Sequence, residues 1–196
     1  MSKEYFNARA TTWDEKVAER DVSRLEAMLA RIEISPGDAV LDVGTGTGVF
    51  VPFLLKKIGS TGRLVCLDFA EGMLDIARDK NFDDNIRYLC VDIENSGLPD
   101  ESFDVVVCYS VFPHFQDKPK ALREICRVLK KHGLLFIGHT SSRQAINEIH
   151  RTLPEVCDHL FPENEEMQRL LFEAGFVDIN ISEGQEHHFV SARKPA

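Results

Sequence analysis

The chain has 196 residues and a formal net charge of −9, and this acidic balance, without a run of lysine or arginine, argues against a nucleic-acid partner. A hydrophobic content of 43% suffices for the core of one domain, and no apolar stretch is long enough to span a membrane, so we expect no membrane partner. Five cysteines without a CxxC pair, behind an N-terminus with no apolar leader segment, predict a reducing, cytoplasmic location.

Strand-like and helix-like segments alternate along the chain. In chain order the hydrophobic pattern predicts a helix over 25–32, a strand over 39–43, a helix over 50–58, a strand over 63–67, a helix over 70–80, strands over 86–91 and 103–108, a helix from 117 to a stop signal at 131–133, a strand over 134–138, helices over 142–151 and 164–174, and strands over 177–181 and 187–192. Apolar strands alternating with helices predict a parallel sheet covered on both faces. The last two strands are joined by a short turn around Gly184, so they should form an antiparallel hairpin. The predicted fold class is therefore α/β: a Rossmann-like, doubly wound, seven-strand sheet, mostly parallel, with one antiparallel strand from the C-terminal hairpin.

A glycine-rich turn follows the first predicted strand. In open α/β sheets, ligands bind beyond the carboxyl ends of the strands, and glycines let the backbone turn sharply and approach a ligand closely. The spacing is GxGxG rather than the GxGxxG of dinucleotide-binding proteins, and a carboxylate two residues ahead suits an ammonium group better than a pyrophosphate. A plain strand-to-helix turn is the alternative. The residues of this turn that we expect to contact a ligand are Asp42, Gly44, Thr45, Gly46 and Gly48.

Acidic residues also follow the second and third predicted strands. Asp68 is placed to accept both hydroxyl groups of a ribose, and Phe69 and Met73 would offer apolar surface to an adenine. Asp92 would accept from the exocyclic amine of the adenine, and the Ile93 amide would donate to a ring nitrogen. Helix capping by Asp68 and ordinary packing of the two apolar residues are the alternatives. Together the motifs predict a ligand that contains adenosine.

In this order the motifs resemble those of the class I S-adenosylmethionine-dependent methyltransferases, particularly the UbiE-like group called methyltransferase domain 11. The segment Asp42–Gly48 resembles motif I of that family, and Asp68–Leu74 resembles its D-x-S-x-x-M-L pattern. The segment Leu122–Lys130 resembles its LxEhxRVLKPGG helix. The resemblance extends over roughly residues 38–138 and implies S-adenosylmethionine as the cofactor.

The chain departs from the family pattern at two places. The residues around Gly72 differ from the usual serine-containing sequence, and Lys131-His132-Gly133 replaces Pro-Gly-Gly. Both places are connecting or capping positions, so we expect cofactor binding to be retained. The resemblance also implies that the N-terminal segment covers the cofactor, with Tyr5 or Trp13 near its methionine end.

These expectations divide one domain, residues 1–196, into four parts. They are N-terminal cap helices over 1–34, a cofactor-binding core over 38–138, an acceptor lid over 139–165 and a closing hairpin over 176–193.

The methyl acceptor should lie beyond the fourth and fifth strands. His114 is a candidate general base or orienting group for the acceptor, with a loop histidine bonded to the backbone as the alternative. Tyr109 and Ser110 are placed to contact the methionine end of the cofactor, unless they only pack in the core.

The lid segment is rich in histidine. His139, Arg143 and His150 are candidate contacts for the acceptor. His139, His150, Cys157 and His159 could instead converge on a metal, but their spacing matches no standard ligand pattern, so we expect no metal.

The predicted function is methyl transfer from S-adenosylmethionine to a small-molecule acceptor. This cofactor has a net charge of +1, which suits a site with three carboxylates better than the anionic pyrophosphate of NAD does. The alternatives are an NAD-dependent oxidoreductase and a non-catalytic, cofactor-binding or metal-responsive module on the same fold. The sequence leaves the identity of the acceptor and the oligomeric state open.

Overall fold

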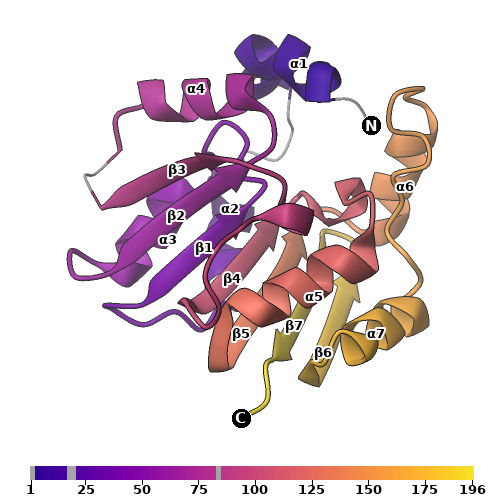
Figure 1. Ribbon diagram of the computed structural model, residues 1–196. Helices are drawn as coiled ribbons and strands as arrows, with labels where there is room; N and C mark the ends of the chain where they lie inside the picture. The colour runs from indigo at the N-terminus through magenta and orange to yellow at the C-terminus, as the bar shows by residue number, and fades with distance from the viewer. Residues whose placement is uncertain (1–2, 17–20, 83–84) are drawn as a thin grey trace.

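The fold is a seven-strand sheet between two layers of helices (Figure 1). The computed structural model describes residues 3–16, 21–82 and 85–196. The helices are α1 (Lys3–Lys16), α2 (Val22–Leu29), α3 (Val51–Ile58), α4 (Glu71–Asp79), α5 (Lys118–Val128), α6 (Arg143–Arg151) and α7 (Asn164–Glu173), with short 3₁₀ turns η2 (Ile93–Asn95) and η3 (Phe112–His114). The strands are β1 (Ala39–Val43), β2 (Arg63–Asp68), β3 (Ile86–Cys90), β4 (Phe103–Tyr109), β5 (Leu129–His139), β6 (Val177–Gly184) and β7 (His187–Arg193).

The strand order is β3-β2-β1-β4-β5-β7-β6. Strand β1 pairs in parallel with both β2 and β4, so the order reverses between β1 and β4. Strand β7 is antiparallel to both of its neighbours, β5 and β6, and all other pairings are parallel. The predicted fold class, with one antiparallel strand from the C-terminal hairpin, is confirmed.

Helices cover both faces of the sheet because the side chains of the central strand point alternately to either side. Leu41 packs in one buried cluster with residues of α5 and α7, whereas its neighbour Val40 packs in a second cluster with residues of α2 and α3. All five residues of β1 are buried. A third, smaller cluster joins α1 to α4 at the carboxyl end of the sheet.

Strand β5 differs from its predicted bounds. It begins at Leu129, directly after α5, rather than at residue 134, and its register with β4 shifts between Phe103 and Val105. His132 has a φ of 62°, and a Cβ on Gly133 would lie 2.8 Å from the carbonyl oxygen of Lys130. The expected stop signal is thus an irregularity inside the strand, which absorbs the bend that follows the helix.

Within the described parts of the chain, no helix combines the length and the apolar character that crossing a membrane requires.

The left-handed backbone at His132 predicts a stabilising substitution. His132→Gly should raise the free energy of unfolding by about 0.5–1 kcal/mol, because relief of the strained φ exceeds the entropic cost of glycine. Lys131→Gly is the matched control: its backbone is not left-handed, so the same change should destabilise by about the same amount. Urea denaturation of both variants measures the difference, and equal effects at the two positions would contradict the argument.

Candidate cofactor and acceptor site

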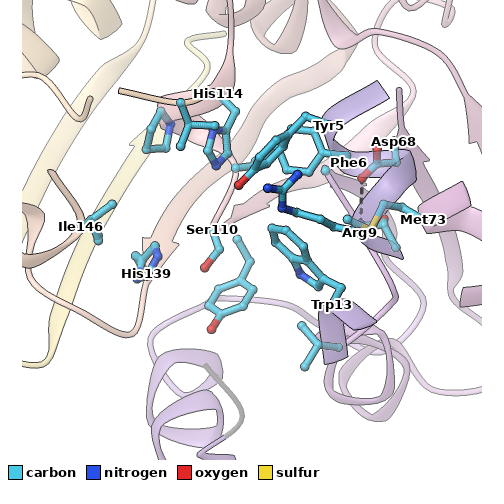
Figure 2. Close-up of a pocket in the computed structure, with 18 of the residues that line it drawn as sticks. Tyr5, Phe6, Arg9, Trp13, Asp68, Met73, Ser110, His114, His139 and Ile146 are labelled. Atoms are coloured by element: carbon cyan, nitrogen blue, oxygen red, sulfur yellow. Dashed lines mark hydrogen bonds between the residues drawn. The ribbon is translucent and has the colours of Figure 1, made fainter. Parts of the chain in front are cut away.

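A cavity of about 510 Å³ lies at the carboxyl ends of β1, β2 and β4, between α1 and α6 (Figure 2). Figure 1 shows these two helices on opposite sides of this end of the sheet. A second cavity of about 130 Å³ adjoins it and shares Gly44, Asp68, Phe69, Val111 and His114. The pair of cavities lies where the strand order reverses, which is the expected ligand position in an open α/β sheet.

The glycine turn forms the floor of the larger cavity. Gly44 has a φ of 72°, and a Cβ there would lie 2.2 Å from Cγ2 of Val111, so only glycine is accommodated without displacing the neighbouring loop. The amides of Gly44 and Thr45 donate to the carbonyl oxygen of Leu67 over 2.7 and 3.1 Å, which binds the turn to the end of β2. Gly48 lines neither of the two cavities. A Cβ on it would lie 3.0 Å from the Phe82 ring, so this glycine permits close packing behind the turn.

Two buried carboxylates face this turn. Asp68 accepts hydrogen bonds from the amides of Gly46 (2.8 Å) and Ala70 (2.9 Å), which leaves lone pairs on both oxygens for ribose hydroxyl groups. Burial raises the pKa of Asp68 to about 6. Asp42 accepts from the Thr45 hydroxyl over 2.8 Å, and burial, reinforced by the nearby charge of Asp68, raises the pKa of Asp42 to about 7. A bound cation would stabilise the ionised form of both groups.

The smaller cavity holds the predicted adenine contacts. It is lined by Asp92, the buried Ile93 and Phe69. One oxygen of Asp92 accepts from the amide of Glu94 over 2.9 Å, which orients the carboxylate at the start of η2. The structure therefore brings the residues after β2 and β3 together as the sequence predicted.

Helix α1 covers the larger cavity. Tyr5 and Trp13 both line it, and Phe6 contacts both Trp13 and Phe69 at ring-centroid distances of 5.7 and 5.5 Å. The helix is tied to α4 by a 2.9 Å hydrogen bond from the amide of Gly72 to Asn7. A Cβ on Gly72 would lie 3.1 Å from the same Asn7 oxygen, so a glycine at this position makes room for α1.

The C-terminal part of α1 is tied to the glycine turn. Asp14 accepts a 2.5 Å hydrogen bond from the Thr47 hydroxyl and forms a 2.9 Å ion pair with Lys80. Lys80 also donates to the carbonyl oxygen of Thr47 over 2.6 Å. The cover and the floor of the cavity are thus one connected structure.

Polar groups gather at the end of the cavity away from Asp68. Tyr109 bonds to the Thr140 hydroxyl over 3.1 Å and stacks on Phe50. Ser110 has a φ of 54°, a strained value for serine, and its buried hydroxyl has no hydrogen-bond partner within the residues that the structure describes. A buried hydroxyl held in this way on a cavity wall is suited to bind a ligand.

The histidines of this end are brought together from three segments. His114 lines both cavities, and His139 and His150 line the larger one; Figure 2 shows the His139 ring beside the Ser110 side chain and the His114 ring above it. The remaining wall is apolar and comes from the lid. Its members are Ile146, Ile149, Leu153 and Val156.

Two predicted lid groups lie elsewhere. Arg143 lines neither cavity; its guanidinium forms ion pairs with Glu163 and Glu183 at 2.7 and 3.5 Å, so it neutralises acidic side chains of the lid and of β6. Cys157 is exposed, and its thiol donates to Asp158 over 2.8 Å. Among the residues that the structure describes, no group of three or more His, Cys, Asp or Glu side chains has a metal-binding arrangement, so the alternative of a four-residue metal site does not form there.

Comparisons with known proteins agree with this geometry. Residues 41–137 match the family model described as a methyltransferase domain. The ubiquinone/menaquinone biosynthesis C-methyltransferase UbiE of Hydrogenovibrio crunogenus is 29% identical over 181 residues, which cover 77% of this chain and 71% of that protein. The corresponding protein of Vibrio campbellii is 32% identical over 136 residues, 67% of this chain, but this match covers only 52% of that protein.

This chain belongs to the S-adenosylmethionine-dependent methyltransferases. Its cofactor is S-adenosylmethionine. A methyltransferase structure from Aquifex aeolicus, 24% identical in sequence, superposes with a TM-score of 0.76 over 95% of this chain and 97% of that one, which confirms the fold.

Three residues of α1 that line the methyltransferase cavity were not predicted. They are Phe6, Arg9 and Thr12. Together with Tyr5 and Trp13 they occupy helical spacings of three and four, so the cap helices predicted over 1–34 could have been used to place all five on one face. Arg9 lies 3.9 Å from the centre of the Tyr5 ring and forms a 3.3 Å ion pair with Glu155, which connects α1 to the lid.

The raised pKa values predict how cofactor affinity depends on pH. S-Adenosylmethionine has a net positive charge, so it binds best when Asp42 and Asp68, with pKa values of about 7 and 6, are ionised. Affinity should rise about tenfold or more between about pH 5.5 and 7.5, and binding near pH 6 should release protons. Calorimetric titration in buffers of different ionisation enthalpy measures both quantities. Asp42→Asn should bind more weakly at about pH 7.5 and respond less to pH; a wild-type affinity independent of pH would contradict the assignment.

Proposed function

We propose that this protein transfers the methyl group of S-adenosylmethionine to a small-molecule acceptor bound between α1, Ser110, His114 and the lid. The observation that carries the proposal is the division of the cavity. One end has two buried carboxylates and the glycine turn, and the other has a strained serine, histidines and an apolar wall. The first end suits a cationic nucleoside ligand, and the second is closed enough to hold a small reactant.

The charges at the cofactor end support S-adenosylmethionine over NAD. Asp42 and Asp68 are both buried, and neither forms an ion pair with lysine or arginine among the described residues, although the charge of Lys3 on the wall of the smaller cavity acts on Asp68. A pyrophosphate beside them would meet negative charge that this lysine compensates only in part. In the proposed arrangement Asp68 accepts the ribose hydroxyl groups. Asp92 and Ile93 bind the adenine, and Asp42 favours the ammonium side of the methionine end.

The chain's own contribution to the reaction would be alignment and exclusion of water. When bound, the cofactor supplies an activated methyl group on a sulfonium, which is a good leaving group. Helix α1 places Phe6 and Trp13 over the cavity, and the lid places Ile146 and Leu153 against its far wall. These groups would hold the acceptor in line with the methyl group in an environment with little water.

A small, largely uncharged acceptor suits the far end of the cavity. Among the residues that the structure describes, Arg9 is the one lysine or arginine on the wall of the larger cavity, and its ion pair with Glu155 neutralises it. The carboxylates on that wall, Asp42 and Asp68, belong to the cofactor end. Recognition there would rest on apolar contact and on single hydrogen bonds to Ser110, His139 and His150.

The proposed function is tested first by cofactor binding and then by turnover. Calorimetric titration with S-adenosylhomocysteine should give micromolar affinity, whereas NAD should not bind. Mass spectrometry of reactions with S-adenosylmethionine and a panel of small thiols, phenols and amines should then detect a methylated product. Binding without any product would favour the non-catalytic module, and binding of NAD instead would refute the cofactor assignment.

The ribose assignment predicts the effect of changing Asp68. Asp68→Ala removes two hydrogen bonds to a charged acceptor, each worth roughly 1.5–3 kcal/mol, so affinity for S-adenosylhomocysteine should fall at least about tenfold. Because Asp68 also accepts from Gly46 and Ala70, Asp68→Asn is needed as a milder variant, and thermal melting checks that each variant is folded. Asp75→Asn, on the exposed side of α4, is the control. Unchanged affinity in folded Asp68 variants would show that the ribose lies elsewhere.

A further inference from the structure

A pair of histidines connects the acceptor end of the cavity to the partly exposed outer part of the lid. Nδ1 of His114, in η3, lies 3.1 Å from Nδ1 of His159, in the segment that follows α6. Two imidazole nitrogens at this distance share one proton, so one ring donates and the other accepts. His114 lines both cavities, whereas His159 lines neither and is only partly buried.

The surroundings fix the position of both rings. His150 donates from Nδ1 to the carbonyl oxygen of His159, which ties that residue to α6. Phe6 packs edge-on against the His114 ring, with a centroid distance of 5.4 Å and an interplanar angle of 76°. The other nitrogen of His114, Nε2, is then the one available to a molecule in the cavity.

We propose that His114 and His159 form a proton relay, in which His114 takes the proton from the reacting atom of the methyl acceptor and His159 passes it to solvent. This inference rests on the proposed methyl transfer and adds two features to it. The reacting atom of the acceptor has a proton to lose, and His159, which does not line the cavity, takes part in its removal.

The relay couples three proton transfers to the making of one bond to the methyl carbon and the breaking of one carbon–sulfur bond. The bond between the reacting atom and its proton breaks, and the same atom forms a bond to the methyl carbon, while the electron pair of the breaking carbon–sulfur bond stays on sulfur. The acceptor proton goes to Nε2 of His114, the Nδ1 proton of His114 goes to Nδ1 of His159, and a proton leaves Nε2 of His159 for water. These proton transfers require that His114 start as the neutral ring with its proton on Nδ1.

The charges around the pair favour transfer in the outward direction. Burial holds the pKa of His114 well below its usual value, and His150, His159, His139 and Lys118 reinforce this, so the ring is neutral and has a lone pair for the acceptor proton. The Lys118 amine donates to the carbonyl oxygens of Pro113 and Phe115 on either side of His114.

The second histidine is in a more favourable place for a proton. Burial also lowers the pKa of His159, with smaller contributions from Lys118 and His150, but the neighbouring Asp158 acts in the opposite direction. A positive charge is therefore less costly on His159 than on His114. The free energy therefore falls when a proton moves from His114 to His159 and then to water.

Kinetics with acceptors of graded acidity test the relay in the full-length protein with S-adenosylmethionine. The probes are benzyl mercaptan and phenol, which are mostly protonated at about pH 7.5, and 4-nitrothiophenol, which is ionised. His114→Gln and His159→Asn should lower kcat/KM for the protonated probes by about 100-fold or more, and for the ionised probe by less than about threefold. In His159→Asn the side-chain carbonyl oxygen still accepts a hydrogen bond from His114, but the side chain takes up no proton. A merely positioning role would therefore leave this variant active, which would overturn the relay, as would equal losses with both kinds of probe.

A second measurement does not depend on finding a good acceptor. The long-range ¹H–¹⁵N NMR spectrum of the complex with S-adenosylhomocysteine should show His114 as the neutral Nδ1–H tautomer at about pH 7.5. A proton on Nε2, or a charged ring, would overturn the relay. His132→Asn serves as the control in both experiments, because His132 lies near the start of β5 and the cavity lies at the other end of this strand, at His139. Failure of S-adenosylhomocysteine to bind would instead refute the proposed function, so the two failures are distinguishable.

Discussion

The carboxylate of Asp68 joins the parts of the structure on which the site depends. Its two oxygens accept from the amides of Gly46, in the turn after β1, and Ala70, at the start of α4. One buried side chain thereby holds the neighbouring loops after β1 and β2 in fixed positions. Burial raises the pKa of Asp68 to about 6, so the same side chain that organises the loops is also electrostatically suited to a cationic ligand.

The cover of the cavity depends on this arrangement. Helix α1 packs against α4 through Phe6, Ala10 and Met73, and Asp14 binds the glycine turn through Thr47. Because the helix contacts both loops that Asp68 connects, its cavity-facing residues keep a fixed position above the floor. The ion pair between Arg9 and Glu155 extends the cover to the lid. The water exclusion that we propose for methyl transfer would thus depend on how the loops are joined.

The histidines show the same dependence on tertiary packing. His114 follows β4, and His150 and His159 belong to the lid, yet a 3.1 Å contact joins the first to the last. In a chain with this sheet order, the segments after β4 and β5 emerge side by side at the carboxyl end. Lid residues therefore meet the loop after β4 directly over the proposed acceptor. His139 and His150 of the lid line the larger cavity, whereas Arg143 lies away from it and neutralises Glu163 and Glu183.

Local sequence patterns predicted the fold class, and they predicted that the glycine turn, Asp68 and Asp92 lie at one edge of the sheet. Strand periodicity, the glycine turn, and the acidic residues 68 and 92 placed directly after strands are local features, and the carboxyl ends of neighbouring parallel strands meet at one edge of a sheet. The family resemblance supplied the expectation that Tyr5 or Trp13 covers the cofactor, and both residues line the larger cavity. Local pattern could not reveal that Gly48 packs against Phe82 instead of a cavity, or that β5 begins at Leu129. Three further outcomes depend on tertiary packing: Arg143 lies outside the cavity, Cys157 is exposed, and His159 contacts His114. Each of these outcomes depends on contacts between segments distant in sequence, and their energies have no signature in the spacing of residues along the chain.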